Sequence, residues 1–386
     1  MATVREKLSA ATVVPLLLAA LTEFAVVTCG IAPPESSPLV LWNPRRDADL
    51  NTDEGEFRRH HAWLWEPRPG VVVHGDAINE DAMRGPPVAR DDRAALRIAV
   101  LGDSTTYGFG LREHDSWGRD LERFLRALDV DVEVLNGGVI GYSIEQGYRL
   151  YLGKIRPFRP DVVVAAFGAV NEHFKDLSTD RAKIDLLSHP LFRLRQLLER
   201  YAAFRLLERA IEGAPEVREL DEDDVTPRVP VREFRRRIAD LKRAVEEDGG
   251  RLVLVSPPRR LDAEARWPDL IDYTEALEEA AKAEGIPLAP VRREFQSRDE
   301  VALGDRFREP SVAKDSPFFI DQWHPSVRGH VVYAGTVGLT LLQAGLLPQL
   351  EGREDVVALL EGAKARAEPG SNGPPGEDEP AEADDG

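Results

Sequence analysis

A serine stands directly after a run of apolar residues that fits a buried strand. Residues 98–101 read Ile-Ala-Val-Leu, and Gly102, Asp103 and Ser104 follow. The carboxyl end of a parallel strand is where open α/β sheets place ligands and reactive side chains. A serine hydroxyl hardly ionises at neutral pH, so it needs a neighbouring base before it can act as a nucleophile. The stretch therefore predicts a reactive serine whose base comes from elsewhere in the chain.

That base is predicted near the other end of the chain, where Asp321 precedes His324 by three residues. An imidazole can take the proton of Ser104 and later give it to the leaving group. The short spacing lets the carboxylate of Asp321 reach the other ring nitrogen, where it would fix the tautomer and stabilise the imidazolium. Ser104, His324 and Asp321 are therefore the predicted nucleophile, base and orienting acid of a serine hydrolase.

The elements that must position these residues follow from the hydrophobic pattern. Short apolar runs alternate with segments whose apolar residues recur every three or four positions, as on one face of a helix. The predicted strands are residues 98–101, 132–135, 161–167, 252–255 and 286–288, and the predicted helices are residues 115–128, 144–155, 231–247, 270–284 and a last helix that Ser326 can cap. This alternation predicts a three-layer α/β/α domain with a mostly parallel, roughly five-stranded sheet.

Four stretches in this pattern resemble the sequence blocks of the SGNH (GDSL-type) hydrolases, a family of serine esterases, lipases and related acyl-transferring enzymes. The stretches are Gly102-Asp103-Ser104, Asn136 to Gly141, the region around Asn171, and Asp321-Gln322-Trp323-His324. They occur in the family's order, within residues 95–345. The resemblance implies a flavodoxin-like sheet and hydrolysis of an ester without a cofactor or metal.

The resemblance also implies an oxyanion hole. Its donors would be the backbone N–H groups of Ser104 and Gly141 and the side-chain amide of Asn171. Such donors stabilise the negative oxygen of a tetrahedral intermediate, and glycine suits an N–H that is aimed into a site because no Cβ stands in the way. Asp103 is expected to hydrogen-bond the turn rather than to react.

The third stretch departs from the family pattern, which is Gly-x-Asn-Asp. Two residues separate Gly168 from Asn171 here, and Glu172 follows. Either the turn is one residue longer, or Ala169 takes the place of the glycine. Glu172 is expected to be a solvated polar group at a strand end, with contact to the substrate as the alternative.

The first 30 residues differ from the rest. Arg5 and Lys7 precede a mostly apolar run from residue 8 to residue 30, interrupted by Pro15 and Glu23. This order is typical of an export signal or signal anchor, and the run is about the 20 residues that cross a bilayer. The positive charges before the run predict a catalytic domain that is exported, membrane-anchored and outside the cytoplasm. The alternative is a buried N-terminal helix of the main domain.

Cys29 lies near the end of this run and is the only cysteine, so no intrachain disulfide can form. Its place resembles that of the lipidated cysteine in a bacterial lipoprotein signal, although Thr28 precedes it where a smaller residue is usual. A lipoprotein anchored through Cys29 is therefore a second prediction for the same segment.

Composition divides the remaining chain. The predicted parts are a linker at 31–60, a hydrolase-like domain at 61–350 that includes a small β extension at 61–90 and a helical insertion at 175–230 over the mouth of the site, and an acidic disordered tail at 351–386. Trp63 and Trp65 are expected to pack the β extension against the domain. The insertion could serve as a lid or as extra packing.

Charge and histidine spacing exclude some functions. The formal net charge is −18, which argues against nucleic acid as a partner because phosphate contacts need clustered Lys and Arg. The histidines other than His324 show no metal-ligand spacing, so neither a metal nor a cofactor is predicted.

The sequence therefore predicts a serine hydrolase that cleaves a carboxylic ester through an acyl-serine intermediate. Its substrate would be a small ester or an acylated glycan. One alternative is an O-acyltransferase or deacetylase that acts on a surface glycan with the same residues. Another is a catalytically silent binding protein.

Overall fold

A computed structural model describes residues 18–31, 55–91, 94–212, 225–353, 355–365 and 367. Its centre is a sheet made of β5 (Leu96–Gly102), β6 (Val132–Gly138), β7 (Val162–Ala166), β10 (Arg251–Val255) and β11 (Leu288–Ala289). The strand order is β11-β10-β7-β5-β6 and every pairing is parallel. The chain passes from β5 to β6, which is the edge strand, and then crosses to β7 on the opposite side of β5. The strand order therefore reverses between β5 and β7. This confirms the predicted α/β class and the parallel sheet.

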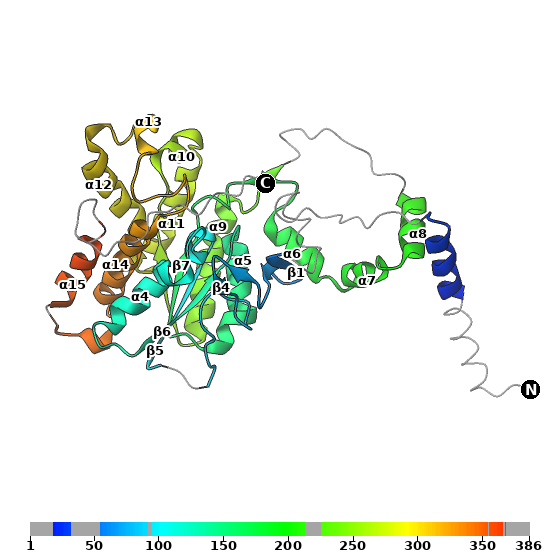
Figure 1. The fold of residues 1–386 in the computed structure, drawn as a ribbon, viewed down its shortest axis with the longest axis horizontal. Coiled ribbons are helices and arrows are strands. Elements are labelled where there is room, and N and C mark those ends of the chain that lie inside the picture. Colours follow the sequence, from blue (N-terminus) through cyan, green and yellow to red (C-terminus); the bar gives the residue numbers. More distant parts are fainter. Residues whose placement is uncertain are drawn as a thin grey trace, which may run out of the picture.

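Helices cover both faces of the sheet, as Figure 1 shows. One face carries α4 (Trp117–Arg126), α12 (Val291–Leu303) and α14 (Val327–Gln343), and the other carries α5 (Ile144–Leu150), α9 (Val231–Glu247) and α11 (Leu270–Glu284). Shorter pieces are α3 (Ser104–Tyr107), α10 (Leu261–Arg266), α13 (Pro310–Ala313), η1 (Glu113–Asp115), η2 (Tyr151–Ile155), η3 (Arg156–Phe158), η5 (Gly304–Arg306) and η6 (Pro348–Leu350).

The central strands are apolar on both sides because both faces are covered. In β5, Ala99 and Leu101 belong to the core beneath α5 and α9, while Ile98 and Val100 belong to the core beneath α4 and α14. Side chains of a strand alternate between faces, so a strand covered on both faces reads as a continuous apolar run. This is why the sequence locates the sheet so well.

Helix α12 was not predicted. Its buried positions are Val291, Phe295 and Asp299, so its apolar face is thin and one of its inward residues is an acid. The predicted helix at 144–155 is α-helical only to Leu150 and continues as the π-helical turn η2. By contrast, α9 and α11 have the predicted bounds.

The β extension consists of two antiparallel pairs. Strand β1 (Phe57–His60) pairs with β2 (Leu64–Pro67), and β3 (Val72–Val73) pairs with β4 (Asp76–Ala77). The extension therefore begins inside the predicted linker, which is a correction to the boundary at residue 60. Phe57 is buried in the same cluster as Trp63 and Trp65, so the first strand belongs to the domain. Residues 32–54 of the predicted linker lie outside the described residues.

The helical insertion is closed at its base by β8 (Lys175–Asp176) and β9 (Thr226–Pro227), which pair antiparallel. Between them lie α6 (Asp180–Ser188), α7 (Pro190–Leu198) and α8 (Ala202–Glu212). Helix α6 packs against α5 and β2, as a buttress would. Helices α7 and α8 extend away from the α/β body in Figure 1, so the interpretation of the whole insertion as a cover over the site is wrong for these two helices.

The chain ends differ from the predictions in two ways. Residues 355–365 form α15 (Asp355–Ala365), which buries Val356 and Leu360 against α14, so the predicted disordered tail contains a packed helix. The helix itself is largely apolar, but it lies in a stretch that is otherwise rich in Glu, Pro and Gly, and this surrounding composition hid it. Residues 368–386 of that tail lie outside the described residues, as do residues 1–17 of the predicted anchor. Residues 18–28 are helical, and no helix among the described residues has the length and apolar character to span a bilayer.

Candidate active site

Ser104 is the first residue of α3, directly beyond β5. Asp103 caps this short helix, since its Oδ1 accepts a hydrogen bond of 2.9 Å from the N–H of Thr105. A side chain at Gly102 would place a Cβ 2.1 Å from Thr106 Oγ1, so only glycine lets the strand turn this sharply against the helix. The serine is thereby held at the carboxyl end of the central strand with its side chain 8% exposed.

The structure brings His324 and Asp321 to this serine from more than 200 residues away. His324 Nε2 lies 2.8 Å from Ser104 Oγ, and His324 Nδ1 lies 2.6 Å from Asp321 Oδ2. Both distances are those of hydrogen bonds. The three residues therefore form the line of contacts that their types and spacing predicted.

Asp321 is fixed by its own loop. Its Oδ1 accepts hydrogen bonds from the N–H groups of Trp323 (2.7 Å) and His324 (2.8 Å). Burial acts to raise the pKa of Asp321, but the contact with the His324 ring and these two N–H donors outweigh it and hold the pKa below its usual value. The carboxylate is therefore ionised near neutral pH and faces the ring nitrogen that must carry a proton.

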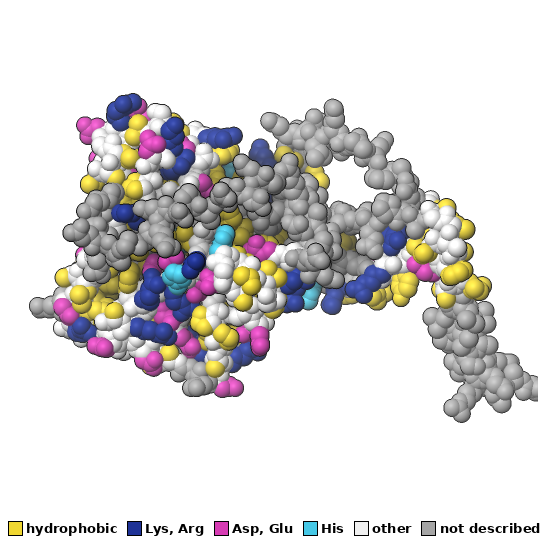
Figure 2. All heavy atoms as spheres, in the orientation of Figure 1, with side chains coloured by type: hydrophobic (Ala, Val, Ile, Leu, Met, Phe, Trp, Pro, Cys, Tyr) yellow, Lys and Arg dark blue, Asp and Glu magenta, His cyan; other side chains and the backbone are white. Residues whose placement is uncertain are grey.

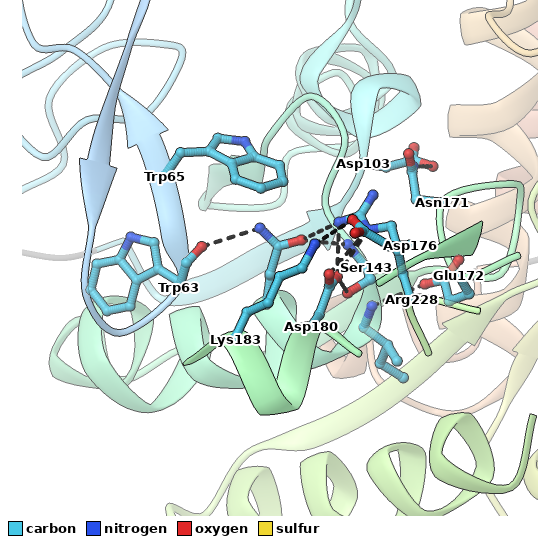
Figure 3. Close-up of polar contacts among 12 residues, drawn as sticks. Trp63, Trp65, Asp103, Ser143, Asn171, Glu172, Asp176, Asp180, Lys183 and Arg228 are labelled. Atoms are coloured by element: carbon cyan, nitrogen blue, oxygen red, sulfur yellow. Dashed lines mark hydrogen bonds and ion pairs between the residues drawn. The ribbon is translucent and has the colours of Figure 1, made fainter. Parts of the chain in front are cut away.

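Asn171 points toward the serine turn. Its Nδ2 donates a hydrogen bond of 2.9 Å to Asp103 Oδ2, and Figure 3 shows the two side chains beside each other. Both residues are buried, and burial raises the pKa of Asp103. An amide nitrogen carries two hydrogens, so this contact leaves one donor of Asn171 for another acceptor. Asp103 hydrogen-bonds the turn as predicted.

Gly141 lies in the turn that follows β6. The turn is closed by a hydrogen bond from the N–H of Tyr142 to the carbonyl of Val139, and Gly141 takes a φ of 77°, where glycine is favoured. Within the described residues, the backbone N–H groups of Gly141 and Ser104 donate to no protein acceptor. Two backbone donors are thus free at the carboxyl ends of β5 and β6.

The β extension holds this turn from outside the sheet. The ring N–H of Trp65 donates to the carbonyl of Ile140 at 3.1 Å, and the Tyr142 hydroxyl donates to the carbonyl of Trp65. The two aromatic rings also meet edge to face. Trp65 and Tyr142 are fully buried, so the hydrogen bonds are shielded from water. The sequence predicts that Trp65 packs against the domain, but no sequence pattern signals this clamp of two hydrogen bonds.

A buried polar network fixes the start of α5 just beyond the turn. Ser143 Oγ donates to Asp180 at 2.6 Å, and Arg228 donates to both Asp180 and Gln146 at 2.8 Å (Figure 3). Gln146 in turn donates to the carbonyl of Trp63 at 3.1 Å. The network joins the base of the insertion, the first turn of α5 and the β extension, so three segments constrain the same turn.

Glu172 is neither solvated nor free to touch a substrate, which corrects both expectations. It is 1% exposed, and its carboxylate accepts the N–H groups of Gly168 (3.1 Å) and Ile144 (2.9 Å). Burial, aided by the nearby charge of Asp103, raises its pKa to about 7. The carboxylate therefore closes the loop after β7, where Gly168 takes a φ of 94°. No feature of the sequence around Glu172, which follows Asn171, indicates that its carboxylate accepts these two N–H groups.

One aromatic side chain that the sequence did not single out, Phe109, packs against the histidine, with its ring centre 4.3 Å from that of His324. In the loop before the histidine, Trp323 packs against Trp267 with ring centres 5.1 Å apart. Among the described residues, no three His, Cys, Asp or Glu side chains are grouped so that they could hold a metal ion. The arrangement offers a nucleophile, a base, an acid and polar donors in an apolar surround.

The comparisons with known proteins come from structures and from a family model. The chain resembles an α/β hydrolase from the metagenome of Lake Arreo, Spain (15% identity, 64% of this chain and 96% of that one, TM-score 0.42). It resembles a lipase/acylhydrolase from Enterococcus faecalis (17%, 64% and 96%, 0.41) and an acetylxylan esterase from Geobacillus stearothermophilus (13%, 65% and 95%, 0.40). No curated protein matches the sequence.

One protein-family model matches a continuous part of the chain that includes Ser104, Asn171, His324 and the residues they contact. It is the model of the GDSL-like lipase/acylhydrolase family, and it matches residues 100–332, which is more than half of the chain. The resemblance inferred from four short stretches is thereby confirmed. The chain belongs to the GDSL-like lipase/acylhydrolase family and is a hydrolase that acts on esters.

Proposed function

We propose that the protein cleaves a carboxylic ester through an acyl-serine intermediate on Ser104. The observation that carries the proposal is the unbroken line of hydrogen-bond contacts from Ser104 through His324 to Asp321. A silent binding protein would have no need to keep an ionised carboxylate, an imidazole and a hydroxyl in this order. Membership of an acylhydrolase family favours water over a sugar hydroxyl as the group that accepts the acyl chain.

The proton path follows from the contacts. Ser104 Oγ attacks the acyl carbon while His324 Nε2 takes the hydroxyl proton, and the same nitrogen then protonates the leaving alcohol. Asp321 accepts the Nδ1–H of His324, which leaves Nε2 as the basic nitrogen. Its lowered pKa keeps the carboxylate charged, so it stabilises the imidazolium formed in each half of the reaction. Water then attacks the acyl-serine by the same path in reverse.

The negative oxygen of each tetrahedral intermediate needs donors that are in place before the reaction. We assign this role to the N–H groups of Ser104 and Gly141 and to the second amide hydrogen of Asn171. Support comes from the two unoccupied backbone donors and from the bond that holds the Asn171 amide against the serine turn. Asp103 would then act as a positioning residue for Asn171.

The protein is further proposed to be membrane-attached through residues 1–30, with the catalytic domain outside the cytoplasm. Support comes from the basic start, the apolar run and the exposed helix at residues 18–28, where Leu18, Leu21 and Phe24 face outward. Lipidation of Cys29, which is exposed, is the competing mode of attachment.

Ser104→Ala and His324→Ala should each lower kcat on a chromogenic ester by about 10⁴–10⁶, because triad members act as one unit. The double variant should be hardly slower than either single one. A fluorophosphonate should label Ser104 in the wild type, as mass spectrometry of the peptide would show. Ser297→Ala and His114→Ala, at exposed sites, are the matched controls. Losses that multiply in the double variant would refute a shared step.

Asn171→Ala should lower kcat by about 10²–10³ with little change in KM, since the lost donor acts mainly in the transition state. Asn171→Asp should be at least as harmful, because it sets a second carboxylate against Asp103 and the forming oxyanion. Asp103→Asn, measured beside them for kcat and thermal stability, separates the loss of the anchoring bond from the loss of the donor. A kcat loss below about tenfold for Asn171→Ala, in a stable protein, would remove Asn171 from the hole.

Tyr142→Phe removes the hydroxyl that ties the Gly141 turn to Trp65 and should lower kcat by about tenfold with KM little changed, because a displaced donor acts on the transition state. Tyr151→Phe is the matched control, since its hydroxyl bonds Asp248 at 2.7 Å outside the site. Equal kcat losses in the two variants would mean that the clamp contributes stability alone.

Full-length protein should sediment with membranes, and protease added to intact cells should cleave it, because the basic start keeps the amino terminus inside. A variant that lacks residues 1–30 should sediment with membranes much less than the full-length protein. If attachment is by the apolar helix, Cys29→Ser should still sediment with membranes. If attachment is by a lipid on Cys29, Cys29→Ser should release the protein. Recovery of the full-length chain wholly in the cytosol would disprove attachment.

A further inference from the structure

The insertion helices α7 and α8 carry leucines on their outer surface. Leu191, Leu194 and Leu197 recur every three residues along α7 and are all exposed, Leu191 by 70%. Tyr201 and Leu207 continue the exposed apolar positions into α8. Figure 1 shows these helices well apart from the α/β body, so the body does not cover them. Large apolar side chains that stay exposed in a row mark an interaction surface.

Basic side chains are interleaved with these leucines. Residues 190–212, which span α7 and α8, hold five arginines and three glutamates, a net charge of +2 in a chain whose net charge is −18. Arg193 and Arg200 are exposed. Hydrophobic and Lys or Arg side chains lie next to each other over α7 in Figure 2. The segment is therefore both apolar and basic, unlike the acidic remainder of the protein.

The helix at residues 18–28 lies against the start of α8. Both carboxylate oxygens of Glu23 accept hydrogen bonds of 2.8 Å, one from the N–H of Ala202 and one from the N–H of Ala203. These are among the N–H groups that the first turn of a helix cannot satisfy internally, and a helix N-terminus favours a negative charge. The two hydrogen bonds lower the pKa of Glu23. The one acid of this helix is therefore ionised and paired with α8.

The pairing matters because most of the remaining helix at 18–28 is apolar and exposed. Leu21, Phe24 and Val27 are exposed, Phe24 by 70%, and Val26 is buried. Large apolar side chains that are exposed together on one helix are expected to be covered by protein or by lipid. Because Glu23 is hydrogen-bonded to the start of α8, any surface that binds this helix also lies close to α8.

The residue mixture alone does not select the occupant, because arginine is also enriched at protein–protein interfaces. The selection comes from the helix at 18–28, which the contacts of Glu23 place beside α8 and which belongs to the segment with the basic start and the apolar run. A helix at the surface of a bilayer has this mixture, because leucines enter the acyl boundary while arginines meet anionic headgroups. We propose that α7, α8 and the helix at 18–28 form one surface that binds an anionic lipid bilayer. The proposal extends, and in part rests on, the membrane attachment proposed for residues 1–30, and it is independent of the ester chemistry.

The test places one environment-sensitive fluorophore at chosen sites of the full-length protein. Cys29→Ser gives a cysteine-free chain, since Cys29 is the only cysteine. Leu194→Cys and Leu207→Cys then report on α7 and α8, Leu18→Cys reports on the N-terminal helix, and Val301→Cys, 78% exposed on α12, is the control on the body. The probe surface is vesicles of phosphatidylcholine, with or without about one-third phosphatidylglycerol.

On the anionic vesicles, the labels at 194, 207 and 18 should brighten at least about twofold and shift to the blue, because they enter an apolar boundary. The label at 301 should not change. Pure phosphatidylcholine should give a smaller response, and Arg193→Gln with Arg200→Gln should reduce the response to anionic vesicles. Arg236→Gln with Arg243→Gln, on α9, is the matched charge control and should leave it unchanged.

Three outcomes would overturn the proposal in different ways. In the first outcome, the label at residue 18 responds to vesicles while the labels at 194 and 207 stay unchanged, like the control at 301. This would keep the attachment by residues 1–30 and remove α7 and α8 from the surface. No response at any site would remove the attachment as well. A blue shift at 194 that grows with protein concentration in the absence of vesicles would assign the surface to a second copy of the chain, which also refutes the lipid proposal.

Discussion

The carboxylate of Asp103, 3% exposed, joins the two loops that stand on either side of the strand reversal. Burying a charged or polar group without partners costs several kcal/mol, so its oxygens must be satisfied. One oxygen takes the N–H of Thr105 in the serine turn, and the other takes the amide of Asn171 after β7. The ends of two adjacent parallel strands are thereby locked to each other. The position of Ser104 and the orientation of Asn171 are two consequences of one buried acid.

Support for the site also comes from outside the residues that match the family. The matched part begins at residue 100, yet Trp65 holds the Gly141 turn and Arg84 donates to the carbonyls of Tyr107 and Gly108 at the end of α3. Both belong to the β extension and are buried. At the other side, Asp180 and Arg228 of the insertion reach the first turn of α5 through Ser143 and Gln146. Segments added to the α/β core therefore stiffen the turn whose N–H groups the proposed reaction needs.

The parts of the site that could be predicted from sequence are those fixed by local spacing. Ser104 follows an apolar strand, and Asp321 and His324 share one short loop, so their chemistry is readable without the fold. Glu172 was misread because one of its partners, Ile144, becomes a neighbour only after β6 and β7 are placed in the sheet, although the other, Gly168, lies in the same loop. Helix α15 was missed because the tail around it is acidic and rich in Pro and Gly, whereas the burial of its Val356 and Leu360 comes from contact with the distant α14. Contacts between distant segments leave little trace in a single sequence.

Glu23 disfavours the entry of the N-terminal apolar run into lipid, but it fixes a contact between that run and the insertion. An acid within an apolar run costs free energy if the run enters lipid, and translocation scales put that cost at about 3 kcal/mol at the centre of a membrane helix. The N–H groups of Ala202 and Ala203 supply the partners that water would otherwise supply. Because the partners sit on the insertion, the catalytic body is joined to the apolar helix both along the chain and through α8. A body held at two points is restricted in how it can rotate over a surface, whereas one linker alone would leave its orientation free.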